Sequence, residues 1–396
     1  MAIELSNITF TEQDDIVPTS GVGQIVNTSI TNTLAGRDII TGTAIQGIAT
    51  PGPYDIVYGI YNSDRLNTND GNDIIMGICS EAEGNFTDFV NYVGLSNDGG
   101  IIDTGDGDDT IIGTDNIPIY DNEGRTSFSG GFNSYMGTVD TGNGDDILMG
   151  TGQVLGFASG YSTVDTGNGD DIIMGTSQNT GIYVDYGTLD TGNGNDMITG
   201  TGRYAGISNN LDIFNTADGN DTIIGNGIEG VGISTGYHLD TGDGNDIITG
   251  ISNGGSYGIA NISRDGFFTN IIDTGEGDDI ITGIGLIGIY NLGFIHTGNG
   301  QDSIIADGGF DGAGNVFLEN GRDYLKGFGS GNFNGGNGQD TLKLTSGSYT
   351  IGISGTTVSF TKNSIIMNTS EFEKLITGNT IYDFSSLANG QIIVVA

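Results

Sequence analysis

The chain has 396 residues, and its 73 glycines against 4 prolines exclude collagen, because glycine shows no three-residue period. Ten basic residues against 50 acidic ones give a formal charge of −40, which argues against nucleic acid or anionic lipid as partners and favours cations. A disordered acidic chain is a poor explanation, since 35% of the residues are apolar and they recur at fixed places.

Residues 1–33 carry no repeated motif and are predicted to form an N-terminal cap. The first ten, MAIELSNITF, include Glu4 and no sustained apolar segment, so they are not a secretory signal peptide. No run of 18 apolar residues occurs, so no membrane-spanning helix is expected. The single cysteine, Cys79, excludes an intrachain disulfide and a paired-thiol zinc site and is expected to be a small packing residue.

Residues 34–344 repeat one ten-residue pattern, written TGNGDDIIMG at 166–175 and TGNGDDILMG at 141–150. With Thr166 as position 1, twelve copies share glycine at position 4, aspartate at position 6, and isoleucine or leucine at position 8. The position-6 residues are Asp38, Asp73, Asp109, Asp146, Asp171, Asp196, Asp221, Asp246, Asp279, Asp302, Asp323 and Asp340.

The spacing of the copies is typical of a solenoid. Between Asp146 and Asp246 the copies lie 25 residues apart, and each interval reads as turn, strand, gap, strand, gap, strand. Alternation along a strand places position 8 inward and positions 7 and 9 outward. The sequence therefore predicts an all-β fold, a right-handed parallel β-solenoid of about 25 residues per coil, with coils about 4.8 Å apart.

Two features of the coils leave alternatives open. The outward positions 7 and 9 are often apolar, as at Ile147, Ile172 and Ile247. This reflects either the β-propensity of these residues or an exposed stripe that packs on another copy or surface. The long coils at 42–67, 77–103 and 113–140 could also frame a cleft.

Residues 345–396 lack the motif, and the segments SYTIGI, TVSFT and NSIIMN alternate as antiparallel strands do. We expect a small antiparallel β cap here, because the last coil of a solenoid otherwise presents an open edge for pairing.

The acidic residues need an explanation of their own. Position-6 carboxylates stacked roughly 5 Å apart repel by about 0.8 kcal/mol even in water, so the stack calls for cations between coils. The turn offers carboxylate and carbonyl oxygens without histidine or cysteine, which favours Ca²⁺ over Mg²⁺, zinc or copper. The alternative is that the motifs are ordinary Asx turns that end strands.

The pattern T-G-x-G-[DN]-D-x-[IL]-x-G resembles the nonapeptide G-G-x-G-x-D-x-U-x of RTX (repeats-in-toxin, hemolysin-type) proteins, which bind calcium in a parallel β-roll. The resemblance implies that position-6 aspartates and turn carbonyls of adjacent coils share Ca²⁺ ions. One motif per coil implies a single row of ions, and Arg37 and Arg322 at position 5 imply weak or absent binding beside them. The implied ligands are the twelve aspartates above and the carbonyls of Gly105, Gly107, Gly142, Gly144, Gly167, Gly169, Gly192, Gly194, Gly219, Gly242, Gly244, Gly275, Gly277, Gly298 and Gly300.

Residues 335–388 also resemble the C-terminal cap of secreted bacterial RTX proteins, especially those of cyanobacterial type. This implies type I secretion through an uncleaved C-terminal signal, an extracellular or cell-surface location, and folding on external Ca²⁺.

Three functions remain in competition. The first is a non-enzymatic structural, adhesive or cell-surface protein whose partners are calcium and a surface polysaccharide or another copy of itself. The second is a polysaccharide-active β-helix enzyme, although no catalytic residue can be singled out and His238 and His296 are expected at equivalent surface positions before turns. The third is an RTX-like ice-binding module, which the mixed residues at positions 3 and 5 disfavour.

Overall fold

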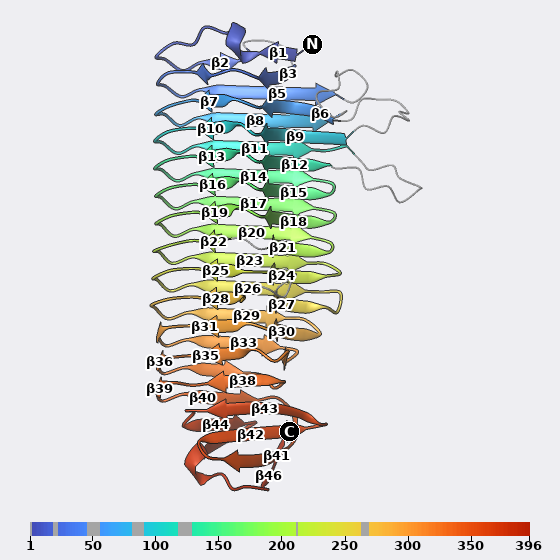
Figure 1. The fold of residues 1–396 in the computed structure, drawn as a ribbon, viewed down its shortest axis with the longest axis vertical. Helices are drawn as coiled ribbons and strands as arrows, with labels where there is room; N and C mark the ends of the chain where they lie inside the picture. The colour runs from blue at the N-terminus through green and yellow to red at the C-terminus, as the bar shows by residue number, and fades with distance from the viewer. Residues whose placement is uncertain are drawn as a thin grey trace, which may run out of the picture. The chain divides into compact units, whose positions relative to one another are not determined.

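The computed structural model describes residues 2–18, 23–45, 56–80, 91–117, 129–210, 213–262 and 269–396. Within these ranges the chain forms stacked coils of parallel strands, with only the short 3-10 helices η1 (Leu5–Asn7) and η3 (Phe384–Ser386) (Figure 1). The predicted all-β parallel solenoid is therefore confirmed. The chain divides into two compact units, Met1–Ser208 and Asn209–Ala396.

The first unit contains three parallel sheets to which each coil contributes one strand apiece. The first sheet has the order β1 (Ala2–Glu4), β3 (Gln24–Asn27), β6 (Ile56–Asn62), β9 (Asn91–Asp98), β12 (Gly130–Tyr135), β15 (Leu155–Gly160) and β18 (Thr180–Asp185). The second has β2 (Ile16–Val17), β5 (Ile39–Ile45), β8 (Ile74–Ser80), β11 (Thr110–Asp115), β14 (Ile147–Gly152), β17 (Ile172–Ser177) and β20 (Met197–Gly202). The third has β4 (Thr31–Asn32), β7 (Arg65–Asn67), β10 (Ile101–Asp103), β13 (Thr138–Asp140), β16 (Thr163–Asp165) and β19 (Thr188–Asp190). Residues 1–33, the predicted N-terminal cap, thus contribute strands to all three sheets.

The second unit repeats this arrangement. Its sheets are β24 (Val231–Thr235), β27 (Tyr257–Asn261), β30 (Ile287–Asn291) and β34 (Phe310–Asp311); β23 (Thr222–Gly227), β26 (Ile247–Ser252), β29 (Ile280–Ile284), β33 (Ser303–Asp307), β37 (Tyr324–Lys326) and β40 (Thr341–Leu344); and β22 (Ile213–Asn215), β25 (His238–Asp240), β28 (Ile271–Asp273), β31 (Phe294–His296), β35 (Asn315–Phe317) and β38 (Gly331–Asn334). The two-residue strands β32 (Asn299–Gly300), β36 (Asn320–Gly321) and β39 (Asn337–Gly338) form a small sheet at the turns. Strand β21 (Ala205–Asn210) contains the boundary between the two units.

The C-terminal residues form the expected antiparallel cap. Strands β41 (Gly347–Ser354), β42 (Thr357–Lys362), β43 (Ile365–Ser370) and β46 (Ile392–Val395) pair antiparallel, as do β44 (Lys374–Thr377) and β45 (Thr380–Asp383). The cap joins the solenoid because β43 and β44 add in parallel to β38 and β40. The last coil is therefore covered by continuous sheet.

The described coils bury one apolar side chain from each of their three strands, usually aliphatic but phenylalanine in some coils, such as Phe132 and Phe157. In the coil that begins at Thr166 these are Ile173, Ile182 and Leu189, all 0% exposed. Position 8 points inward and positions 7 and 9 outward, as the alternating burial of β14 and β17 shows and as the sequence predicted. Cys79 is also fully buried, among Ala44, Val57, Tyr92 and Ile117, which agrees with a packing role.

The described part of the chain contains no helix long and apolar enough to cross a membrane. Its stability rests on the column of inward aliphatic residues, whose burial removes apolar surface from water.

Truncation of this column should be costly. Ile173→Ala leaves a cavity between coils, and we expect it to lower the free energy of unfolding by about 3 kcal/mol. The neighbouring Ile172, which is only partly buried, is the matched control, and Ile172→Ala should cost less than about 1 kcal/mol. Urea unfolding of both variants at one fixed calcium concentration measures the difference; equal losses would contradict the assigned strand orientation.

Candidate metal centre

The motif turns of successive coils lie in direct contact. Gly167 and Gly169 have φ angles of 89° and 144°, a region that favours glycine. A Cβ atom at either position would lie 1.6 Å or 1.9 Å from the carbonyl oxygen of Gly142 or Gly144 in the preceding coil. In this coil a side chain at either position would require the neighbouring turn to shift.

Copies without glycine at position 2 keep the same backbone. Leu34, Asn69, Ala217 and Glu319 stand there with φ angles of 70°, 57°, 53° and 66°. The local conformation is thus imposed by coil-on-coil contact and tolerates strained residues.

The position-6 aspartates form a hydrogen-bonded column within each unit. The backbone N–H of Asp146 donates to Oδ1 of Asp171 in the next coil at 2.8 Å, and Asp171 donates to Asp196 in the same way. The same bond joins Asp38 to Asp73, Asp73 to Asp109 and Asp109 to Asp146 in the first unit, and Asp221 to Asp246, Asp246 to Asp279, Asp279 to Asp302, Asp302 to Asp323 and Asp323 to Asp340 in the second. All twelve aspartates are at most 2% exposed.

Two residues extend the column and were missed by the sequence analysis. The backbone N–H of Asp15 donates to Oδ1 of Asp38, and that of Asp340 donates to Oε2 of Glu373. If Asp15 is placed at position 6 of the motif, Val17 occupies the apolar position 8, but Gln13 stands where the other copies have the position-4 glycine. At the C-terminal end, Glu373 would occupy position 6, and the only residue around it that matches the motif is Leu375 at position 8.

In ten of the twelve copies, the second oxygen of the position-6 carboxyl lacks a hydrogen-bond partner. Among the described residues, buried Oδ2 atoms without a partner occur at Asp38, Asp73, Asp109, Asp146, Asp171, Asp246, Asp279, Asp302, Asp323 and Asp340. The Thr166 hydroxyl lies close enough to Asp171 to favour its ionised form, but it donates to the carbonyl of Thr191 at 3.2 Å and makes no hydrogen bond to Oδ2. A buried unpaired oxygen is costly, and a column of them is uncommon.

Burial makes these carboxyls difficult to ionise. Desolvation raises the pKa of Asp146 and of Asp171 to about 7, against the opposing effects of the Thr141 and Thr166 hydroxyls and of backbone N–H groups. Burial likewise raises the pKa of Asp109 to about 8, and the charges of Asp146 and Asp73 add to the increase. Without a cation, the column would therefore hold protons near neutral pH.

The other acids of the turn have ordinary partners. At position 5, Oδ1 of Asp145 accepts the backbone N–H of Asp170, and Oδ1 of Asp170 accepts that of Asn195. Just before the turn, Oδ1 of Asp165 accepts the N–H of Gly167, which is an Asx turn. The Asx-turn interpretation therefore accounts for Asp165, and hydrogen bonds between coils account for the carboxylates at position 5.

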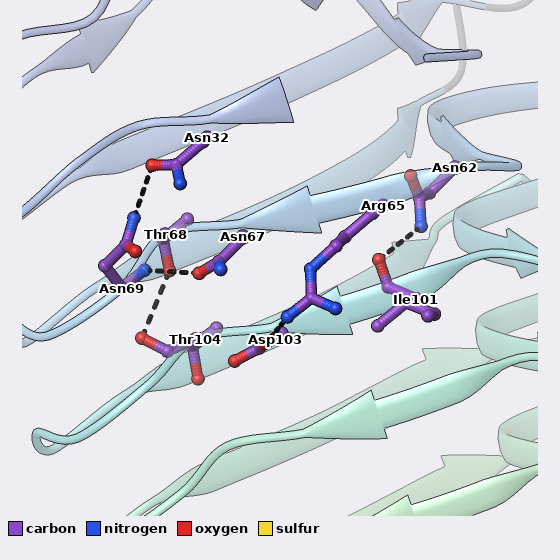
Figure 2. Close-up of polar contacts among 9 residues, drawn as sticks. All are labelled: Asn32, Asn62, Arg65, Asn67, Thr68, Asn69, Ile101, Asp103 and Thr104. Atoms are coloured by element: carbon purple, nitrogen blue, oxygen red, sulfur yellow. Dashed lines mark hydrogen bonds and ion pairs between the residues drawn. The ribbon is translucent and has the colours of Figure 1, made fainter. Parts of the chain in front are cut away.

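The polar ladder continues along the third sheet of the first unit. Figure 2 shows the ion pair between Arg65 and Asp103, which join neighbouring coils, and the hydrogen bond from Asn69 to Asn32. Arg65 thereby offsets the charge of Asp103, one of a row of aspartates that end the strands of the third sheet just before the turns, with Asp140, Asp165 and Asp190. Along that row, burial raises the pKa of Asp140, and the neighbouring Asp103 adds to the increase.

Arg37 and Arg322 occupy position 5 as the sequence indicated. The backbone N–H of Arg37 donates to Oδ1 of Asp14, and that of Arg322 donates to the carbonyl of Gly300. The positive charge of Arg37 opposes the increase in the pKa of Asp73, which burial raises to about 6.

The two histidines do not occupy equivalent positions, contrary to expectation. His238 pairs with Ile271, whereas Asp273 is the residue that pairs with His296. His296 Nδ1 lies 2.8 Å from Glu319 Oε1, and both side chains are partly exposed. The expectation failed because the two histidines lie at different distances from the motif that follows them, so they occupy different positions of the strand before the turn.

The donor set of the corner fits calcium better than a transition metal. No group of three or more His, Cys, Asp or Glu side chains that could hold a metal ion occurs in the described ranges. Backbone carbonyls would therefore have to supply most ligands, as hard oxygen-binding cations permit. The unpaired Oδ2 atoms are the side-chain oxygens left available for this purpose.

No protein-family model matches the sequence, and no curated protein matches it either.

Proposed function

We propose that the chain is a calcium-binding β-solenoid of RTX type with a structural, adhesive or cell-surface role, which folds on external Ca²⁺. The observation that carries this proposal is the column of buried position-6 carboxyls with unpaired Oδ2 atoms. A cation between coils would satisfy these atoms and neutralise the column.

A comparison of positions 5 and 6 within the chain supports the need for charge. At position 5, Oδ1 of Asn245 accepts the N–H of Asp278, as Asp170 does for Asn195, so aspartate and asparagine serve equally. At position 6 an asparagine Oδ1 could accept the same N–H, yet all twelve copies have aspartate. Hydrogen bonding alone does not require this choice, whereas a bound cation does.

The proposed ligands follow from the stacking of the turns. Oδ2 of Asp146 and of Asp171 would supply charged oxygens, and the carbonyls of turn glycines such as Gly142 and Gly144 would supply neutral ones. Bound calcium would contribute the positive charge that allows the carboxyls to ionise at neutral pH. Because each ligand set would need two stacked coils, binding energy becomes folding energy.

An extracellular role accords with this coupling. In a compartment poor in calcium, stacking at neutral pH would require the buried carboxyls either to take up protons or to stay ionised without a cation, and both disfavour it. Millimolar calcium outside would favour stacking. The C-terminal cap, which closes the last coil, is the segment that resembles a type I secretion signal.

Isothermal titration with Ca²⁺ and circular dichroism in EDTA test the proposal. We expect several ions per chain, a gain of β-structure on calcium addition, and much weaker effects of Mg²⁺, which demands stricter geometry. A chain that is equally β-structured and equally stable in EDTA and in millimolar Ca²⁺ would refute it.

A further inference from the structure

The outer face of the first sheet in the first unit carries a hollow of about 370 Å³. It crosses β6, β9, β12, β15 and β18, which include strands of the three long coils noted in the sequence. Its floor is a register row of small or polar residues, Ser96, Asn133 and Ala158. The volume lies in the range of small-ligand sites.

Tyrosines and carboxylates border this floor. Tyr58 and Leu155 line one side, and Tyr135 and Tyr161 line the other. Asp98 and Asp185 lie in the register row of Tyr135, at the two ends of the same side. The hollow therefore combines flat apolar surfaces with acceptor oxygens and contains no basic side chain among its lining residues.

The tyrosine rings on the outer side are exposed and arranged in series. Tyr135, Tyr161 and Tyr186 are 41%, 51% and 50% exposed. The Tyr161 ring stacks on that of Tyr186 with centroids 5.0 Å apart and meets Tyr135 edge-on at 6.0 Å. The rings form a stacked row along neighbouring coils, rather than a cage around one point.

The backbone beneath these rings is strained. Tyr161 and Tyr186 have φ angles of 50° and 58°, and the equivalent residue of an earlier coil is Gly99, with φ 70°. Gly99 and Tyr161 each donate a backbone N–H to the next coil, to the carbonyls of Tyr135 and Asp185. Met136, at the same position of the intervening coil, has φ 53° as well. Glycine suits this conformation, so each residue with a side chain here carries a conformational cost.

We propose that this hollow binds a neutral oligosaccharide. The apolar C–H faces of sugar rings pack on tyrosine rings, and their hydroxyl groups donate to carboxylate and amide oxygens such as those of Asp98 and Asn133. Anionic saccharides are disfavoured by the acidic rim and by the formal charge of −40. An organic cation would be better held by rings that surround it, which the row does not provide. The site lies apart from the calcium corner, since none of its lining residues is a proposed calcium ligand.

Titration of the full chain with neutral hexaoses tests this site. The probes are cellohexaose, xylohexaose, laminarihexaose and mannohexaose, with oligogalacturonate as the anionic probe and choline as the cationic one. The chain has no tryptophan, so tyrosine emission reports binding alongside calorimetry. We expect at least one neutral hexaose to bind saturably, and oligogalacturonate and choline not to bind.

Variants assign the binding to the hollow. Tyr161→Gly removes the ring and relieves the strained φ, so it should weaken binding by about tenfold or more while the melting temperature stays the same or rises. Tyr135→Ala should weaken binding similarly. Tyr204→Ala is the matched control, because Tyr204 is 57% exposed but does not line the hollow, and its binding should be unchanged. Binding of choline alone, no binding of any neutral hexaose, or binding unaffected by Tyr161→Gly and Tyr135→Ala would overturn the proposal.

Discussion

Replacement of Asp171 by asparagine should lower the free energy of unfolding at saturating calcium by about 3 kcal/mol, since it removes one charged partner of a buried cation. The substitution preserves size and keeps Oδ1 as the acceptor for the N–H of Asp146. What it removes is the negative charge at Oδ2, the buried oxygen without a partner. The loss should therefore report on the cation and not on the hydrogen bond.

The same variant should behave differently in EDTA. Without calcium, Asp171→Asn removes a buried group that is costly to ionise and repels Asp146, so stability should be unchanged or higher. Urea unfolding at pH 7.5 in calcium and in EDTA gives the two values. An equal loss in both conditions would mean that Asp171 is only a structural acceptor.

Asp170→Asn is the control for this experiment. Asp170 is adjacent in sequence, exposed, and accepts the N–H of Asn195 through Oδ1, which an asparagine can do as well. We expect its unfolding free energy to match that of the parent chain in calcium and in EDTA.

The sequence predicted those parts of the fold whose residues recur at the same motif positions in every coil. Glycine at position 4, aspartate at position 6 and an aliphatic residue at position 8 define the turn, the column and the core strand, and Ile173 lies where this phase places it. The three-strand coil followed because, in the 25-residue coils between Asp146 and Asp246, the remaining apolar residues also recur at nearly constant distances from the turn.

The chemistry of the acids was less predictable. The sequence could treat Asp170 and Asp171 only as two adjacent charges. The structure separates them, since Asp170 is an exposed hydrogen-bond acceptor and Asp171 is buried with one oxygen unpaired. This difference depends on the register between coils, which a pattern within one coil does not contain.

The oligosaccharide hollow lay beyond sequence reasoning for a related reason. Tyr135 and Tyr161 are 26 positions apart and follow no motif, so only the pairing of β12 with β15 brings them together. The long coils suggested a cleft, but their length could not indicate which residues would line it.

The calcium-free chain should lose stability as the pH rises from about 4 to 8, because the folded state raises the pKa of its buried carboxyls. An aspartate in an unfolded chain has a pKa of about 3.9. Burial raises the pKa of Asp146, Asp171 and Asp302 to about 7 and that of Asp109 to about 8. Between the two sets of values the folded chain binds more protons than the unfolded one, so stability falls with increasing pH. The protonated column stabilises fully below about pH 4, and this contribution is lost as the pH passes through 6 to 8.

Calcium should reverse this slope, because the ion and the protons compete for the same carboxyls. At saturating Ca²⁺ we expect stability to rise from pH 5 to 8, and calcium binding at pH 6 to release protons. Urea unfolding in EDTA and in calcium measures the slopes, and titrations in buffers of different ionisation enthalpy count the protons. The double variant Asp146→Asn with Asp171→Asn separates the column from general surface repulsion, since it should flatten both slopes while retaining the surface acids. A calcium-free stability that rises across this window, or slopes unaffected by the double variant, would show that the buried column does not control the pH dependence.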